Sequence, residues 1–186
     1  MVVVLAMGLI GPAGAFASSL AVGETLPKLQ GEFLTGRRAM LPQAAAGKVA
    51  LLLLGFTYES RFEVEEWARE FRREFEKKPN AAFYEIPMIG GLARLGKWFI
   101  DSGMRRGTPE ADREHVITVY GGTEEWKRRV GFKDPKAAYL LLLDTRGKVA
   151  WECSDAFSEE RYRALSQRVS RLLPGELPAA GLPPGQ

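Results

Sequence analysis

The stretch Leu51-Leu-Leu-Leu-Gly-Phe-Thr-Tyr-Glu-Ser-Arg-Phe62 decides the fold of this chain. It belongs to an unbroken apolar run from Val49 to Phe56, which is typical of a central strand covered on both faces. A short turn follows, and it contains no cysteine. The stretch therefore predicts a buried strand that ends in a turn at the start of a helix.

The helix after this turn is expected over residues 62–78. Its apolar residues recur at intervals of three and four along one face: Val64, Trp67, Phe71 and Phe75. Glu and Arg alternate on the remaining face, where such pairs support a helix. The pattern predicts an amphipathic helix packed on the sheet, ended by Pro79 and Asn80.

The rest of the chain predicts an α/β fold in which strands and helices alternate. The expected elements are a hairpin over 31–41, a strand over 82–87, a helical segment over 90–106, a short strand over 115–120, a short helix from Thr123, a strand over 139–144, its hairpin partner over 149–152, and a helix from Ser158. In the segment 90–106, an apolar helical face is expected from Leu92, Leu95, Phe99 and Met104, widened by Trp98 and Ile100.

Length and composition indicate one globular domain with a single well-buried core. The net charge of +3 does not form a dense basic tract, which argues against a nucleic-acid-binding protein. His115 is the sole histidine and Cys153 the sole cysteine, so we expect neither a metal site nor an internal disulfide. No cofactor is expected.

The two ends of the chain differ in composition from its body. Residues 1–17 are apolar and end in Ala15-Phe16-Ala17, a small-x-small pattern typical of signal peptidase cleavage. We therefore expect residues 1–17 to be a signal peptide or an N-terminal anchor, 18–173 the folded domain, and 174–186 a disordered tail rich in Pro, Gly and Ala. The protein is then exported, either periplasmic or anchored to the membrane and facing the periplasm.

The order of the expected elements resembles the thioredoxin-like architecture in its redoxin form, over roughly residues 22–173. The stretches that carry the resemblance are Gly47–Phe56 and Leu140–Val149. The resemblance implies a three-layer α/β sandwich, with a mixed central sheet flanked by helices. Redox-active members carry Cys-x-x-Cys at the start of the first helix, but those positions fall near Glu59 and Phe62 in this chain. The proline expected in cis before the strand at Tyr139 is Ala138.

A narrower resemblance links the chain to the mitochondrial ATP-synthase assembly factor family known as ATPase assembly factor ten. It rests on the order and spacing of the stretches 55–62, 129–151 and 157–165. The resemblance implies a non-catalytic protein, a chaperone-like assembly factor that binds a protein client such as a membrane complex. The absence of a peroxidatic cysteine from the turn also argues against an enzyme.

Two other functions stay open. The chain would be a redoxin-type thiol oxidoreductase or peroxidase if Cys153 served as the lone nucleophile, or a structural or regulatory domain that only keeps the fold. For partner binding, the candidates are two groups of residues: Tyr58, Glu59, Ser60 and Arg61 in the turn, and Trp98, Arg105 and Arg106 in the segment 90–106. The second group is basic with an aromatic, which suits an acidic partner or an anionic membrane surface.

Overall fold

The computed structural model describes residues 20–174. The predicted leader at 1–17 lies outside the described residues, as does the predicted tail at 174–186 apart from its first residue. No helix within 20–174 has the length and apolar character needed to cross a membrane.

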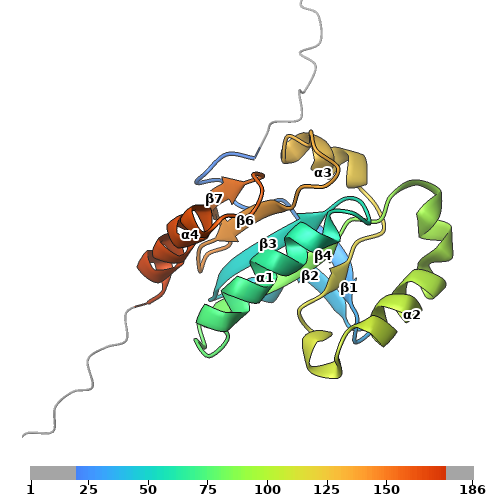
Figure 1. Ribbon diagram of the computed structural model, residues 1–186, viewed down its shortest axis with the longest axis horizontal. Helices are drawn as coiled ribbons and strands as arrows, with labels where there is room; N and C mark the ends of the chain where they lie inside the picture. The colour runs from blue at the N-terminus through green and yellow to red at the C-terminus, as the bar shows by residue number, and fades with distance from the viewer. Residues whose placement is uncertain (1–19, 175–186) are drawn as a thin grey trace, which may run out of the picture.

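A four-stranded mixed sheet forms the centre of the molecule (Figure 1). Its strand order is β4-β3-β6-β7, and the strands are β4 Ala81–Pro87, β3 Val49–Gly55, β6 Tyr139–Leu143 and β7 Val149–Cys153. The β3 and β4 strands are parallel, whereas β6 is antiparallel to both β3 and β7. All residues of β3 and β6 are buried, as their continuous apolar sequences predict.

Two helices cover one face of this sheet. The helix α1 spans Arg61–Phe75 and α4 spans Glu159–Leu172. Alternate strand residues such as Leu51 and Leu53 pack against Trp67 and Phe71 of α1 and against Leu165 of α4 in one hydrophobic cluster. The predicted amphipathic character of both helices is therefore confirmed.

The other face carries a second sheet and a short helix. The hairpin β1 Leu29–Phe33 and β2 Arg38–Leu41 is joined by β5 Ile117–Thr118 in the order β2-β1-β5, and α3 spans Thr123–Arg129. The side chains of β3 that alternate with those facing α1, such as Leu52 and Leu54, pack in the cluster on this side with Trp126 of α3. The three-layer prediction is confirmed, with this second sheet sharing the outer layer with a helix.

The helix α2 Lys97–Gly107 follows the 3₁₀ segment η2 Gly91–Gly96 and lies at the edge of the molecule next to β1 (Figure 1). Two further 3₁₀ turns are η1 Gln43–Ala45 and η3 Glu110–Asp112. The predicted strand over 115–120 is shorter than expected, because only Ile117 and Thr118 pair with β1. The short helix predicted from Thr123 is α3, which begins at that residue and has Gly122 as its N-cap residue.

Candidate functional site

The turn that follows β3 is held together by its own hydroxyl groups. The Ser60 hydroxyl donates to the carbonyl of Thr57 at 2.9 Å, and the Ser60 amide donates to Thr57 Oγ1 at 3.2 Å. Ser60 is the N-cap residue of α1 and is 0% exposed, and its side chain makes no capping bond to the helix amides. The Ser60 side chain therefore closes the turn and is covered from solvent.

A hydrogen bond ties this turn to the loop that precedes β6. Thr57 Oγ1 donates to the carbonyl oxygen of Pro135 at 2.5 Å, across 78 positions in the sequence. The hydroxyl of Tyr139 holds the same loop, since it accepts from the amides of Lys133 and Asp134. Ala138 is buried, and the cis peptide bond of the described chain lies elsewhere, at Leu41-Pro42.

Replacing Thr57 with valine is expected to lower the free energy of unfolding by about 1–2 kcal/mol. Valine has the shape of threonine but removes the donor to Pro135 and the acceptor for the Ser60 amide. Urea unfolding of T57V measures the loss, and T57S, which keeps the hydroxyl, is the matched control. Equal stability of the two variants would show that the link between the loops contributes nothing.

The outer surface of the turn is aromatic and carries one cation. Tyr58 and Phe62 are 70% and 59% exposed, and the Arg61 guanidinium lies over both rings, 4.1 and 4.5 Å from their centroids. Glu59 is also exposed. Of the four turn residues predicted to bind a partner, three therefore reach solvent, and Ser60 does not.

The second predicted group lies on a different element. Trp98, Arg105 and Arg106 belong to α2, and Trp98 is 73% exposed. Arg106 bonds Ser102 on the same helix, whereas the Arg105 Nε donates to the carbonyl of Leu34 at 2.7 Å. Within residues 20–174, no hydrogen bond, ion pair or ring contact joins these three residues to the turn, so the two groups are separate surfaces. Partner binding by either group stays a prediction.

Cys153 lies at the same end of the sheet as the turn. The register places Leu53, Leu140 and Cys153 in one row across β3, β6 and β7. With adjacent strands roughly 4.8 Å apart, the backbone of Cys153 lies on the order of 10 Å from that of β3. The segment after β7 is also tied to the first turn of α1, because the amide of Phe157 donates to the Glu63 carboxylate at 2.9 Å.

The Cys153 side chain is half-buried beside a pocket of about 260 Å³. The pocket is lined by Val130 and by residues of β6, of β7 and of the segment after β7. These residues are Tyr139, Leu140, Leu141, Glu152, Ser154 and Asp155. Burial raises the pKa of the Cys153 thiol, and the Asp155 carboxylate raises it further. The Asp155 amide and the Arg161 guanidinium act in the opposite direction, without reversing the shift. The thiol is therefore mostly protonated at neutral pH.

Two polar groups of functional interest were not predicted from the sequence. Asp101 is 4% exposed and accepts a hydrogen bond from the Tyr120 hydroxyl at 2.6 Å, next to Lys97 and Glu32. Glu85 lies beside the Arg72–Asp112 ion pair in a second pocket of about 240 Å³. Of the two groups, only the one around Asp101 could have been found in the sequence. Lys97, Asp101 and Arg105 are spaced four residues apart, and residues at that spacing share a helix face. In the described residues, no group of three or more His, Cys, Asp or Glu is placed to hold a metal ion.

No family model matches the sequence, and no curated protein matches it. The structure, in contrast, is similar to many solved ones. A protein assigned as the thiol:disulfide interchange protein DsbE from Chlorobium tepidum has a TM-score of 0.58 at 18% identity, over 84% of this chain and 100% of that one. The fold is thioredoxin-like.

Two other thioredoxin-like structures have similar scores. The exposed lipoprotein thioredoxin Etrx1 of Streptococcus pneumoniae has a TM-score of 0.54 at 12% identity, over 78% of this chain and 100% of that one. A thiol peroxidase from Chromobacterium violaceum has a TM-score of 0.53 at 14% identity, over 83% and 88%. At these identities the similarity establishes the thioredoxin-like fold.

The prediction of a non-catalytic, chaperone-like assembly factor is contradicted by these comparisons. The similar structures are named for thiol–disulfide exchange or peroxide reduction, which is the chemistry of the alternative prediction, and not for the assembly of a membrane complex. The prediction took the cysteine-free turn as evidence that thiol chemistry had been lost altogether. The structure instead places the one thiol of the chain at the same end of the sheet, two strands away.

Proposed function

We propose that this chain is a redoxin-type thiol oxidoreductase that uses Cys153 as its single reactive group. The observation that carries the proposal is the position of Cys153, which lies at the turn-bearing end of a thioredoxin-like sheet and beside a pocket. The Glu63–Phe157 hydrogen bond fixes the segment after Cys153 against the start of α1. The thiol therefore occupies a defined place in the fold.

A single cysteine limits the chemistry to exchange through a mixed disulfide. The Cys153 thiolate attacks one sulfur of a substrate disulfide, the substrate S–S bond breaks as the new S–S bond forms, and the departing sulfur leaves as a thiolate that takes up a proton. A small thiol then attacks the substrate sulfur of the mixed disulfide and releases the Cys153 thiolate. Electrons thus pass from the small thiol to the substrate disulfide.

Exchange fits this site better than peroxide reduction. A thiol peroxidase works through a thiolate that is abundant at neutral pH. Burial raises the pKa of Cys153, which keeps the thiolate population small. The intrinsic nucleophilicity of a thiolate rises with its pKa, which partly offsets the smaller population in an exchange reaction.

An exported location is part of this proposal. Disulfide substrates persist outside the cytoplasm. The apolar residues 1–17 support export at the level of sequence, and the likeness to an exposed lipoprotein thioredoxin agrees with it.

The decisive experiment measures disulfide exchange by the purified protein at several pH values. We expect the protein to accelerate the reduction of a disulfide-bonded peptide by glutathione, with a rate that rises about tenfold per pH unit from pH 7 until the thiol ionises. Mass spectrometry should detect a mixed disulfide between the peptide and Cys153, and C153S should remove both signals. A rate equal to that of glutathione alone at every pH would overturn the proposal.

A relocated thiol is the matched control for the pocket. The double variant C153S/S170C keeps one cysteine but moves it to an exposed position of α4 that does not line the pocket. We expect this variant to lose most of the acceleration. If it exchanged disulfides as fast as the natural protein, any accessible thiol would suffice and the site at Cys153 would have no function of its own.

A further inference from the structure

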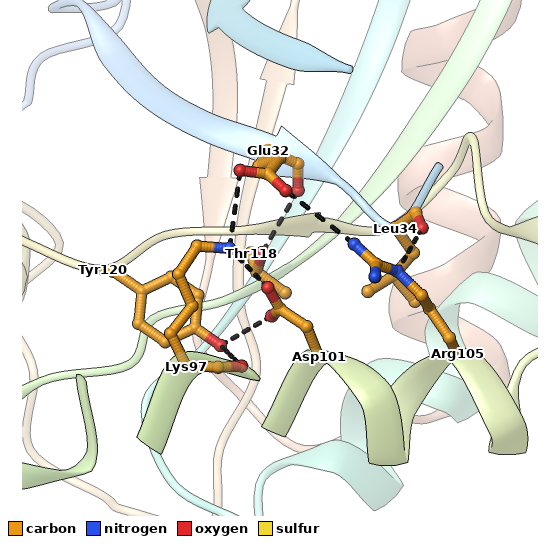
Figure 2. Close-up of polar contacts among 7 residues, drawn as sticks. All are labelled: Glu32, Leu34, Lys97, Asp101, Arg105, Thr118 and Tyr120. Atoms are coloured by element: carbon orange, nitrogen blue, oxygen red, sulfur yellow. Dashed lines mark hydrogen bonds and ion pairs between the residues drawn. The ribbon is translucent and has the colours of Figure 1, made fainter. Parts of the chain in front are cut away.

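The helix α2 turns its charged side toward the protein. Lys97, Asp101 and Arg105 are spaced four residues apart and all face β1 or Tyr120 (Figure 2). The Lys97 ammonium lies 3.4 Å from the Glu32 carboxylate and also pairs with Asp101, whose carboxylate accepts from the Tyr120 hydroxyl at 2.6 Å. These contacts fix which side of the helix faces solvent.

The opposite side of the segment is apolar and uncovered. Leu95, Trp98 and Phe99 are 80%, 73% and 74% exposed, and the two rings contact each other edge to face with centroids 4.9 Å apart. An amphipathic helix on a globular protein normally buries its apolar side and solvates its polar side. The segment departs from this pattern at Leu95, Trp98 and Phe99, whereas Ile100 and Met104 are partly buried. A cluster of exposed large apolar side chains marks an interaction surface.

The net positive charge of the protein is concentrated in the same segment. The chain has 26 basic and 23 acidic residues. Residues 91–107 contain four of the basic ones, Arg94, Lys97, Arg105 and Arg106, and one acidic one, Asp101. The remaining residues therefore carry 22 of each sign, so the excess of +3 in the sequence belongs to this segment, in which Lys97 and Arg105 pair with Glu32 on the side that faces the protein.

We infer that the apolar side of η2 and α2 binds an anionic membrane surface. Exposed Trp, Phe and Leu beside basic residues on a short helix are typical of a helix that lies in the interface, with its rings at the level of the headgroups. Anionic lipids would attract the positive charge of the segment that remains after Lys97 and Arg105 have paired with Glu32 and Asp101. This inference does not depend on the proposed thiol chemistry.

A second copy of the chain fits this surface less well. A twofold contact through α2 would bring two segments that each carry a net positive charge against one another. Such a dimer would bury the rings only by opposing like charges. An acidic protein partner would satisfy the charge but would require a complementary apolar groove, whereas a lipid surface accommodates rings without one.

Vesicle binding tests the inference, with Trp98 as an internal probe. Three of the four tryptophans are shielded in the protein, since Trp67 and Trp126 are buried and Trp151 is partly buried. We expect the full-length protein to co-sediment with vesicles of 7:3 phosphatidylcholine and phosphatidylglycerol, and its emission to shift to shorter wavelength as Trp98 enters the interface. Binding should weaken as salt is raised, and pure phosphatidylcholine vesicles should bind less.

Two double variants distinguish membrane binding by this surface from nonspecific adsorption through any exposed aromatic rings. W98A/F99A should lose about tenfold or more of the partition coefficient, because it removes most of the apolar side chain that inserts. Y58A/F62A removes two comparably exposed rings at the other predicted surface and should bind vesicles like the natural protein. Equal loss in both variants, no binding to anionic vesicles, or a dimer in solution that W98A/F99A dissociates would each overturn the inference.

Discussion

The free energy of unfolding should fall by about 3 kcal/mol as the pH rises from 4.5 to above 7, and Glu85 is the cause. Burial raises the pKa of Glu85 from its usual 4.5 to about 7, opposed by Arg72 and reinforced by Glu65 and Asp112. Between these two pH values the folded protein keeps a proton that the unfolded chain has released. The folded state is therefore favoured at the acidic end of this window and loses that advantage as Glu85 ionises.

The substitution E85Q isolates this effect. Glutamine resembles the protonated carboxyl, so E85Q should match the natural protein near pH 5 and exceed its stability by up to about 3 kcal/mol near pH 8. Urea unfolding at both pH values measures the difference. E59Q, at an exposed glutamate of the turn, is the matched control. A natural protein whose stability is the same at pH 5 and pH 8 would contradict the assignment.

Replacing Trp67 with alanine should cost about 3–5 kcal/mol of stability, the largest loss expected from one substitution. Trp67 is 0% exposed and packs between the sheet and α4, with its ring centroid 5.2 Å from that of Phe157. Its indole Nε1 is buried and has no hydrogen-bond acceptor in the described structure. The Trp67 ring therefore stabilises the protein by packing, whereas its buried, unpaired N–H lowers the free energy of unfolding.

The substitution W67F separates these two contributions. Phenylalanine keeps an aromatic ring and removes the unpaired N–H, which by itself costs about 1–3 kcal/mol when buried. We expect W67F to lose much less than W67A, about 1–2 kcal/mol for the smaller ring. Thermal or urea unfolding of the two variants makes the comparison. Equal losses in W67F and W67A would mean that the ring at this position contributes little.

The central elements of the fold were predictable because their sequences are strongly patterned. The continuous apolar runs at Val49–Gly55 and Tyr139–Leu143 leave no alternative to buried strands, and Asp144 caps the following turn by accepting from the amides of Arg146 and Lys148. The length of the strand near Ile117 was harder to predict. Its end is set by pairing with β1, 86 positions away in sequence, where the Thr118 hydroxyl donates to the carbonyl of Glu32.

For the candidate site, only the absence of a cysteine from the turn was predictable. The sequence shows that the turn has no cysteine, but the nearness of Cys153 depends on the register of three strands, which no local pattern encodes. The orientation of α2 could not be predicted for a similar reason. Its periodicity reveals an apolar side, whereas the side that faces the protein is chosen by Glu32 and Tyr120, which are remote in sequence.

The position of α2 at one edge of the molecule affects how the thiol would meet its substrates. In Figure 1, α2 lies on the right of the molecule, whereas β7 lies on the left next to α4, at the far end of the strand order β4-β3-β6-β7. A molecule that rests on a bilayer through α2 would hold the Cys153 pocket at the distal end, turned toward the aqueous compartment. The bound protein would then sample dissolved disulfides and projecting domains of membrane proteins, and lipid peroxides would lie beyond its reach.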